Sequence, residues 1–138
     1  MAITAAIHSR LANDATLAAL LASYDSAPAV FTTDPVPGDA VLPYVVSVGE
    51  VVNRPFDTKT TRGNEIWRDV RCYDAADGSA VTVEAMADRV RALFHRQSFL
   101  LPGFAWILAE CSGPIVADEQ DAYGRIVTVK LTLEEVLP

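Results

Sequence analysis

The residues that could do chemistry in this chain are first of all its two cysteines and two histidines. Metal and redox centres place such side chains at short, recurring spacings. Cys72 and Cys111 lie far apart, with no Cys or His at ligand spacing, and both fall in apolar, strand-like runs. We therefore expect two reduced, buried thiols. His8 and His95 fall in predicted helices without partners, so we expect surface or partly packed histidines.

One acidic segment could also bind a metal ion. Asp118, Glu119 and Asp121 resemble part of a calcium loop, but the segment lacks the glycine and the terminal bidentate glutamate of an EF-hand. A solvated acidic loop is the better interpretation. The phosphate-binding, zinc-protease and nucleophile-elbow motifs do not occur in the sequence. We expect no catalytic residue, no metal and no cofactor.

Aromatic residues fall at strand and helix positions typical of a core or a subunit interface: Trp67, Tyr73, Phe94, Phe99, Phe104 and Trp106. A base-stacking platform would need Lys and Arg around these rings. The chain instead has 11 Lys and Arg against 18 Asp and Glu, a formal net charge of −7. That sign argues against a dedicated nucleic-acid-binding protein.

A polar segment, residues 53–64, departs from this acidic balance. It carries Arg54, Asp57, Lys59 and Arg62 and has no apolar periodicity. We expect a long exposed hairpin loop. Loops of this length are often functional or mobile, so a solvated tip and a partner-binding tip both fit.

The chain has 138 residues, 51% of them hydrophobic and 21% charged. These values are typical of one globular domain, and we expect a single domain over residues 1–138. The amino-terminal residues lack the features of a signal peptide, and no apolar run approaches the length of a membrane span. We expect a soluble protein of a reducing compartment.

The amino-terminal region predicts short helices followed by irregular structure. Ile3, Ile7 and Leu11 recur every four residues, which is typical of an amphipathic helix. Asn13 and Asp14 offer caps for a second short turn. The prolines between residues 26 and 43 exclude a helix there. Within this stretch we expect one short edge strand at Val30, Phe31 and Thr32.

The middle of the chain predicts two paired strands. Residues 44–52 are rich in β-branched side chains, which favours a strand buried on both faces, with Gly49 as a bulge. Residues 65–73 alternate, placing Ile66, Val70 and Cys72 on one face with Arg68 as the polar intruder on that face. The polar segment would connect the two strands.

The last half predicts one long helix and two more strands. A turn and cap at residues 77–79 precede a helix to about Gln97, whose apolar stripe is Val83, Met86, Ala87, Val90, Leu93 and Phe94. A strand at 104–111, an acidic loop at 112–124 and an alternating strand at 125–133 follow. The sum is an α+β fold: a mainly antiparallel β-sheet with one long helix packed on a face and a short N-terminal helical segment.

Several segments, in this order, resemble a family of phage tail-completion or tail-terminator proteins of the head-to-tail joint, also found in prophages and gene transfer agents. The segments are LANDATLAALLASYDSAPAVFTTDPVPGDAVLPYVVSVGE, then EIWRDVRCYDAADG followed by SAVTVEAMADRVRALFH, and finally DAYGRIVTVKLTLEE. The resemblance covers nearly the full length. It rests on the order and spacing of small features.

The resemblance implies a structural role and no enzymatic activity. It implies that this chain, like the proteins it resembles, forms a homo-hexameric ring that ends tail-tube polymerisation. The implied partners are the major tail tube protein and a head-side stopper or connector protein, with DNA passing through the bore without specific binding and with no membrane contact. The implied location is the bacterial cytoplasm during assembly and then the neck of a phage-like particle.

The same resemblance implies which residues make contacts between proteins. The polar segment with Arg54, Asp57, Lys59 and Arg62 is the candidate inter-ring or lumen loop. The candidate subunit-interface strands contain Val30, Phe31, Thr32, Lys130 and Thr132. Two alternatives stay open: a tail-tube or head-tail connector subunit, and a small ligand-binding or enzymatic α+β domain, which would need a pocket with convergent polar groups.

Overall fold

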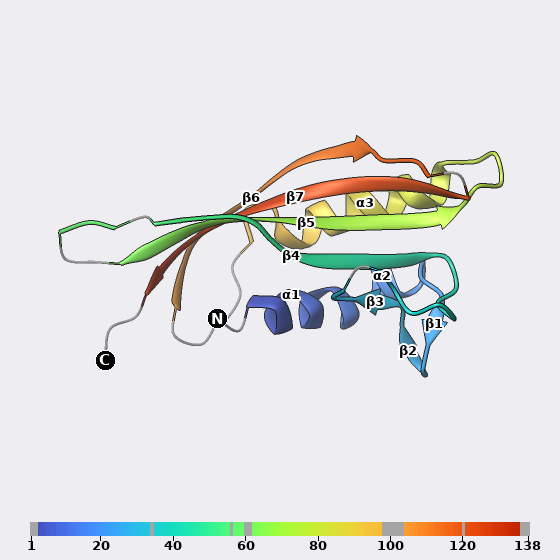
Figure 1. Cartoon of the computed structure of the whole chain (residues 1–138), viewed down its shortest axis with the longest axis horizontal. Helices are drawn as coiled ribbons and strands as arrows, with labels where there is room; N and C mark the ends of the chain where they lie inside the picture. The colour runs from blue at the N-terminus through green and yellow to red at the C-terminus, as the bar shows by residue number, and fades with distance from the viewer. Residues whose placement is uncertain are drawn as a thin grey trace.

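The computed structural model describes residues 3–33, 35–55, 57–59, 62–97, 104–119 and 121–135. Within these residues, five strands form a sheet in the order β3-β4-β5-β7-β6, and two form the separate pair β1-β2. All neighbours pair antiparallel except β3 and β4, which are parallel. The elements are α1 (Ile3–Ala12), α2 (Ala15–Ala18), β1 (Ser23–Tyr24), β2 (Ala27–Pro28), β3 (Val30–Phe31), β4 (Tyr44–Pro55), β5 (Gly63–Ala75), α3 (Val81–Phe94), β6 (Phe104–Val116) and β7 (Ala122–Glu135). The predicted α+β class is confirmed (Figure 1).

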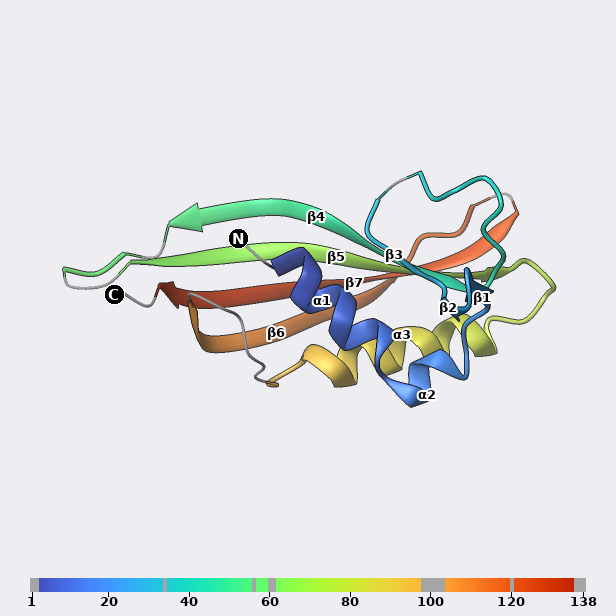
Figure 2. The same cartoon turned by 90° about the horizontal axis from the view of Figure 1, so that it is seen from below.

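The helices α1 and α3 lie on the same face of the sheet, as Figures 1 and 2 show. The alternation predicted for β7 is confirmed, because every second residue is buried in the core: Val127, Val129, Leu131 and Leu133. The apolar stripe of α3 is buried as predicted against these residues and against Ile66, Val70 and Cys72 of β5. Ile3, Ile7 and Leu11 of α1 complete this core. One face of the sheet is therefore sealed by helices.

Arg68 is the predicted polar intruder on this sealed face, and its side chain is 2% exposed. Its Nη2 atom donates a hydrogen bond to Thr4 Oγ1 of α1 at 2.8 Å. A buried guanidinium is tolerated only where hydrogen bonds replace water. The contact therefore helps to position α1 against the sheet.

Asp14 joins the short amino-terminal helices to α3. As predicted, it caps α2: its Oδ2 accepts a hydrogen bond from Leu17 N at 2.9 Å. The same carboxylate accepts two hydrogen bonds from Arg89 of α3, at 2.8 and 2.7 Å. The hydrogen bonds from Arg89 are the main reason that the pKa of Asp14 lies below its usual value.

The predicted hairpin between the two strands is confirmed, but the loop predicted over residues 53–64 is too long. β4 continues to Pro55 and β5 begins at Gly63, with Arg54 opposite Glu65 and Pro55 opposite Asn64. Only residues 56–62 connect the strands. Here β5 also pairs with β7, as far as Gly63 opposite Glu134. Main-chain hydrogen bonds to neighbouring strands therefore extend β4 and β5 through these polar residues, although apolar side chains are missing there.

The prediction of a loop over residues 112–124 is also too long. β6 continues to Val116 and β7 begins at Ala122, which leaves residues 117–121 as the turn. The pairing register shifts between Ser112 and Ile115, where Gly113 has a φ of 91°. Gly113 and Pro114 thus mark a bulge inside a strand rather than its end.

The other boundaries need smaller corrections. The N-cap of α3 is Ala80 rather than Ser79, although Ser79 Oγ accepts a hydrogen bond from Val81 N at 3.4 Å, and the helix ends at Phe94 rather than near Gln97. β4 is buried at residues 45–47, but Val52 is 41% exposed, so the burial on both faces predicted for residues 44–52 fails at its far end. A register shift between Ser47 and Glu50 agrees with the bulge predicted at Gly49.

Candidate assembly surfaces

The face of the sheet opposite α1 and α3 is covered only in part by the described residues. At one end, Val36 and Leu42 of the segment between β3 and β4 pack on a small cluster formed by Val46, Tyr73 and Ala122. Over the rest of this face the structure places no described helix, as the two cartoon views show (Figures 1 and 2). We call this surface the open face. Side chains alternate between the two faces along each strand, and those on the open face include Trp67 and Lys130, which lie opposite each other on β5 and β7.

A shallow hollow of about 390 Å³ lies on the open face across β4, β5 and β7. We call it the Trp67 hollow; its lining residues are Val52, Arg54, Trp67, Asp69 and Thr128. The Arg54 guanidinium lies 5.9 Å from the centroid of the Trp67 ring, and Lys130 Nζ lies 5.3 Å from it. Such positions are favourable for cations because the ring face is electron-rich. The hollow is therefore an aromatic surface flanked by two cations.

The chemistry of the Trp67 hollow favours recognition rather than catalysis. Its carboxylate, Asp69, accepts a hydrogen bond from Thr128 Oγ1 at 2.8 Å, and Lys130 lies 3.9 Å from Glu65 Oε2. The Asp69 carboxylate is therefore already engaged by a hydroxyl group of the same hollow. Among the described residues, no group of three or more His, Cys, Asp or Glu is placed to hold a metal ion.

The structure divides the predicted polar-loop residues between two places. Arg54 lies on β4 at the Trp67 hollow, whereas Asp57, Lys59 and Arg62 lie in the connection between β4 and β5 and are exposed. Asp57 Oδ1 accepts a hydrogen bond from Gly63 N at 3.2 Å, and the Arg62 carbonyl accepts one from Glu135 N at 2.6 Å. Figure 1 shows this hairpin extending past the helices, at the end of the molecule opposite β1 and β2.

The predicted interface strands occupy different positions in the sheet. β3 is an edge strand, as predicted, but Val30 is 7% exposed and Thr32 follows the strand. The Phe31 ring packs between Tyr24 and Tyr44, with centroid distances of 5.1 and 5.7 Å. β7 is paired on both sides, so Lys130 and Thr132 can contact a partner only through their side chains. The structure thus brings Lys130 together with Arg54, which the sequence pattern had assigned to a separate loop.

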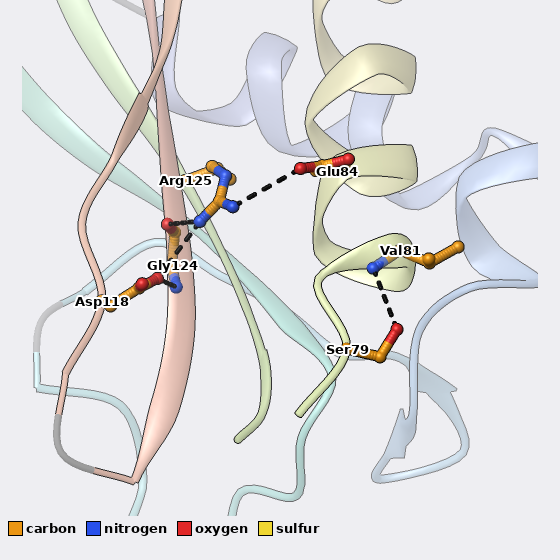
Figure 3. A network of polar contacts seen from close by, with 6 residues as sticks. All are labelled: Ser79, Val81, Glu84, Asp118, Gly124 and Arg125. Carbon is orange, nitrogen blue, oxygen red and sulfur yellow. Dashed lines mark hydrogen bonds and ion pairs between the residues drawn. The ribbon is translucent and has the colours of Figure 1, made fainter. Parts of the chain in front are cut away.

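The turn between β6 and β7 is held by a polar network that begins with Asp118. Its Oδ1 accepts hydrogen bonds from Gly124 N at 3.0 Å and from Arg125 Nη1 at 3.1 Å. Arg125 also lies 3.6 Å from Glu84 of α3, as Figure 3 shows. A Cβ on Gly124 would collide with the Ala117 carbonyl, so the turn packs tightly on β7. The predicted acidic segment is therefore anchored through Asp118 to the sheet and to α3.

Apolar side chains lie exposed beside this turn. Ile115 is 61% and Val116 is 62% exposed at the end of β6. Glu119 and Asp121 are also exposed, and neither forms an ion pair with a residue that the structure describes. We call Ile115, Val116, Glu119 and Asp121 the turn patch. Neither its aliphatic part nor its link to Arg125 could be read from the sequence, which predicted a loop here.

The two cysteines are buried thiols and the two histidines are partly packed, as the sequence predicted. Burial raises the pKa of Cys72 to about 12 and that of Cys111 to about 11, and both side chains are buried thiols. His95 Nδ1 accepts a hydrogen bond from Cys111 N at 3.0 Å, and His8 is half-buried on α1. Phe94 is fully buried, as predicted for a core aromatic residue. The position of Phe99 lies outside the described residues, as does the side chain of Trp106.

The sheet is sealed on one face, and the open face with its cation-flanked hollow and the projecting hairpin are the surfaces left for contacts with other molecules. The chain belongs to the tail completion protein gp17 family, whose model matches residues 5–134. It is a structural protein of phage tails and not an enzyme, and the resemblance noted in its sequence is confirmed.

The fold is also similar to one that has been solved. A chain from the structure described as "Virion of native gene transfer agent (GTA) particle" matches with a TM-score of 0.77 and 21% sequence identity, covering 96% of this chain and 94% of that one. No curated protein gives a significant sequence match. No described helix is long and apolar enough to cross a membrane.

Proposed function

We propose that the chain is one subunit, folded as a single domain, of a hexameric ring that ends polymerisation of the tail tube and joins the tail to the stopper or connector of the head. The observation that carries this proposal is the match to the tail completion family across residues 5–134. The similar fold of a chain in a gene transfer agent virion supports it. The protein would assemble in the bacterial cytoplasm and remain in the neck of a phage-like particle.

The surfaces of the sheet suit a ring of identical copies. A closed ring larger than a dimer needs two different surfaces on each copy, because each subunit meets one neighbour on each side. The chain offers the edge strand β3 with Phe31 and Thr32, and the open face with Lys130 and Thr132. We assign these surfaces to contacts between copies within the ring.

The hairpin between β4 and β5 suits a contact with the adjoining ring. Its exposed connection carries Lys59 and Arg62, while the Asp57 carboxylate is engaged by Gly63 N within the hairpin. Lys59 and Arg62 therefore present positive charge to a partner. We assign this tip to the tail tube protein or to the head-side stopper, with Arg54 at its base.

The net charge of −7 suits a ring through which DNA passes. An acidic wall repels phosphates and lowers the affinity for DNA at every position along the bore. A subunit of this composition would let the duplex move without binding it. The proposed ring therefore needs no DNA-specific residue.

The experiment that tests the proposal compares Arg62→Glu with Arg96→Glu in a particle-producing strain. Both residues are exposed cations, but Arg96 lies after α3, away from the hairpin tip. We expect Arg62→Glu to leave rings visible by negative-stain microscopy and to lower the fraction of tails joined to heads, whereas Arg96→Glu changes neither. Normal joining with Arg62→Glu would remove the tip from the contact between rings.

A further inference from the structure

Two exposed apolar surfaces can make the contact between copies more specific than the open face as a whole. One is the Trp67 hollow, where Val52 is 41% exposed beside the indole ring. The other is the turn patch, where Ile115 and Val116 are each more than half exposed. Neighbouring exposed aliphatic side chains on a soluble domain are typical of binding surfaces.

The two surfaces cannot meet within one copy of the chain. Trp67 lies opposite Lys130 on β7, whereas Ile115 lies opposite Ile126. These positions differ by four residues along β7, or roughly 13 Å at the rise of a strand, and by further strands across the sheet. A contact that uses both surfaces must therefore join different places on two copies, which is the arrangement that closes into a ring.

Their charges are complementary. Arg54 and Lys130 flank the Trp67 hollow. Of the carboxylates near them, Asp69 accepts a hydrogen bond from Thr128 and Glu65 lies 3.9 Å from Lys130, so the exposed Arg54 is the main cation that a partner would meet. Glu119 and Asp121 flank the aliphatic side chains of the turn patch and form no ion pair with a described residue. Opposite potentials on two apolar surfaces favour one orientation of docking and disfavour contacts between like surfaces.

The hollow also has room for the patch, and the patch is held in place. A cavity of about 150 Å³ accommodates a benzene ring, and the Trp67 hollow measures about 390 Å³. The link from Asp118 through Arg125 to Glu84 fixes the turn, as Figure 3 shows. The bulge at Gly113 and Pro114 interrupts the outer edge of β6, so this part of the strand is suited to side-chain contacts rather than to extension of the sheet.

We propose that the Trp67 hollow of one copy receives Ile115 and Val116 of the next copy, with Glu119 and Asp121 of the patch facing Arg54 and Lys130. This inference rests on the proposed ring, whose lateral contact it names. The occupant of the hollow is then a second copy of this chain. The hairpin tip stays available for a different protein.

Cysteine crosslinking tests the contact directly. A chain carrying both Val52→Cys and Ile115→Cys is incorporated into particles, which are purified and oxidised with copper phenanthroline. We expect a ladder of covalent multimers of this chain. The natural thiols do not interfere because Cys72 and Cys111 are buried. In particles that contain a mixture of the two single variants, we expect dimers that hold one chain of each kind.

Matched controls separate a specific contact from random collision. Each single variant alone, and Val52→Cys mixed with Ala5→Cys on the exposed side of α1, should give roughly tenfold less dimer, because only a docked pair has a high effective concentration of thiols. Strong homodimers from either single variant would overturn the heterologous contact. A crosslink from residue 52 to a protein of different mass would mean that another virion protein fills the hollow.

The test also separates this inference from the proposed function. If microscopy shows the rings in place and the doubly substituted chain gives no ladder, the contact is wrong and the ring remains. If the chain is absent from the joint between tail and head, the proposed function itself fails.

Discussion

Asp14 carries a prediction that combines helix capping, an ion pair and pH. Its carboxylate is 13% exposed, caps α2 through Leu17 N and accepts two hydrogen bonds from Arg89. Asp14→Ala removes both roles, whereas Asp14→Asn keeps a capping oxygen and removes the charge. The difference between the two variants isolates the cap, which is worth about 1 kcal/mol.

The expected order of stability is therefore wild type, then Asp14→Asn, then Asp14→Ala. Loss of the cap alone should lower the free energy of unfolding by about 1 kcal/mol. The assay is urea unfolding followed by circular dichroism, at one fixed protein concentration because assembly would raise the apparent stability. Equal stability of the two variants would refute the capping role.

The charge gives a pH dependence with a definite sign. The pKa of Asp14 in the folded chain is lowered from its ordinary value of 3.8, chiefly by hydrogen bonds from Arg89. A lowered folded pKa contributes stability that is fully present above the unfolded pKa and is lost as the pH falls through the folded pKa. The gap between wild type and Asp14→Asn should be constant above about pH 5 and shrink below pH 3.8. A gap that does not change with pH would contradict this account.

Three further predictions concern the core, the turn and the thiols. Leu131→Ala should cost roughly 2 to 5 kcal/mol in urea unfolding, while the exposed Val52→Ala should change it by less than about 0.5 kcal/mol; similar losses would mean that the buried face is misassigned. Gly124→Ala should destabilise the chain by roughly 1 to 3 kcal/mol, because the added methyl group meets the backbone of the facing turn; a thermal melt equal to wild type would contradict that packing. Cys72 and Cys111 should not react with Ellman's reagent at pH 8 until urea unfolds the chain, because both are buried and burial raises both pKa values; rapid reaction of the native protein would argue against their burial.

Hydrophobic periodicity predicted the core correctly. The alternation in β7 and the stripe in α3 follow directly from which side chains leave water, and every residue of both patterns is buried. Arg68 was also assigned to the correct face, because side chains in a strand alternate regardless of their polarity. Burial therefore carries most of the fold information in this sequence.

Strand ends could not be predicted in the same way. Residues 53–55 and 112–116 are strand because neighbouring strands supply hydrogen bonds to their backbones, a contribution that side-chain polarity does not reveal. The hairpin of β1 and β2 turns at Asp25 and Ser26, which have φ values of 52° and 67° without the glycine or asparagine that usually marks such a turn. Asp and Ser are common in turns of every kind, so they do not by themselves indicate a two-residue hairpin.

The assembly surfaces depend on contacts between distant segments. Arg54, Trp67 and Lys130 come from three strands and meet only because of the order β4-β5-β7. The sequence indicated Arg54 and Lys130 as separate candidates and placed Trp67 in the core or an interface. They meet in one hollow because of the pairing register between these strands. A single sequence does not specify that register where polar residues occupy the exposed face.

The measurement that tests the central claim most directly is electron microscopy of particles made without this protein, with the wild-type chain supplied from a plasmid as the control. A tail terminator predicts unterminated or overlong tails and tails detached from heads in its absence, with normal particles restored by the plasmid. Tails of normal length attached to heads in the complete absence of the chain would contradict the account.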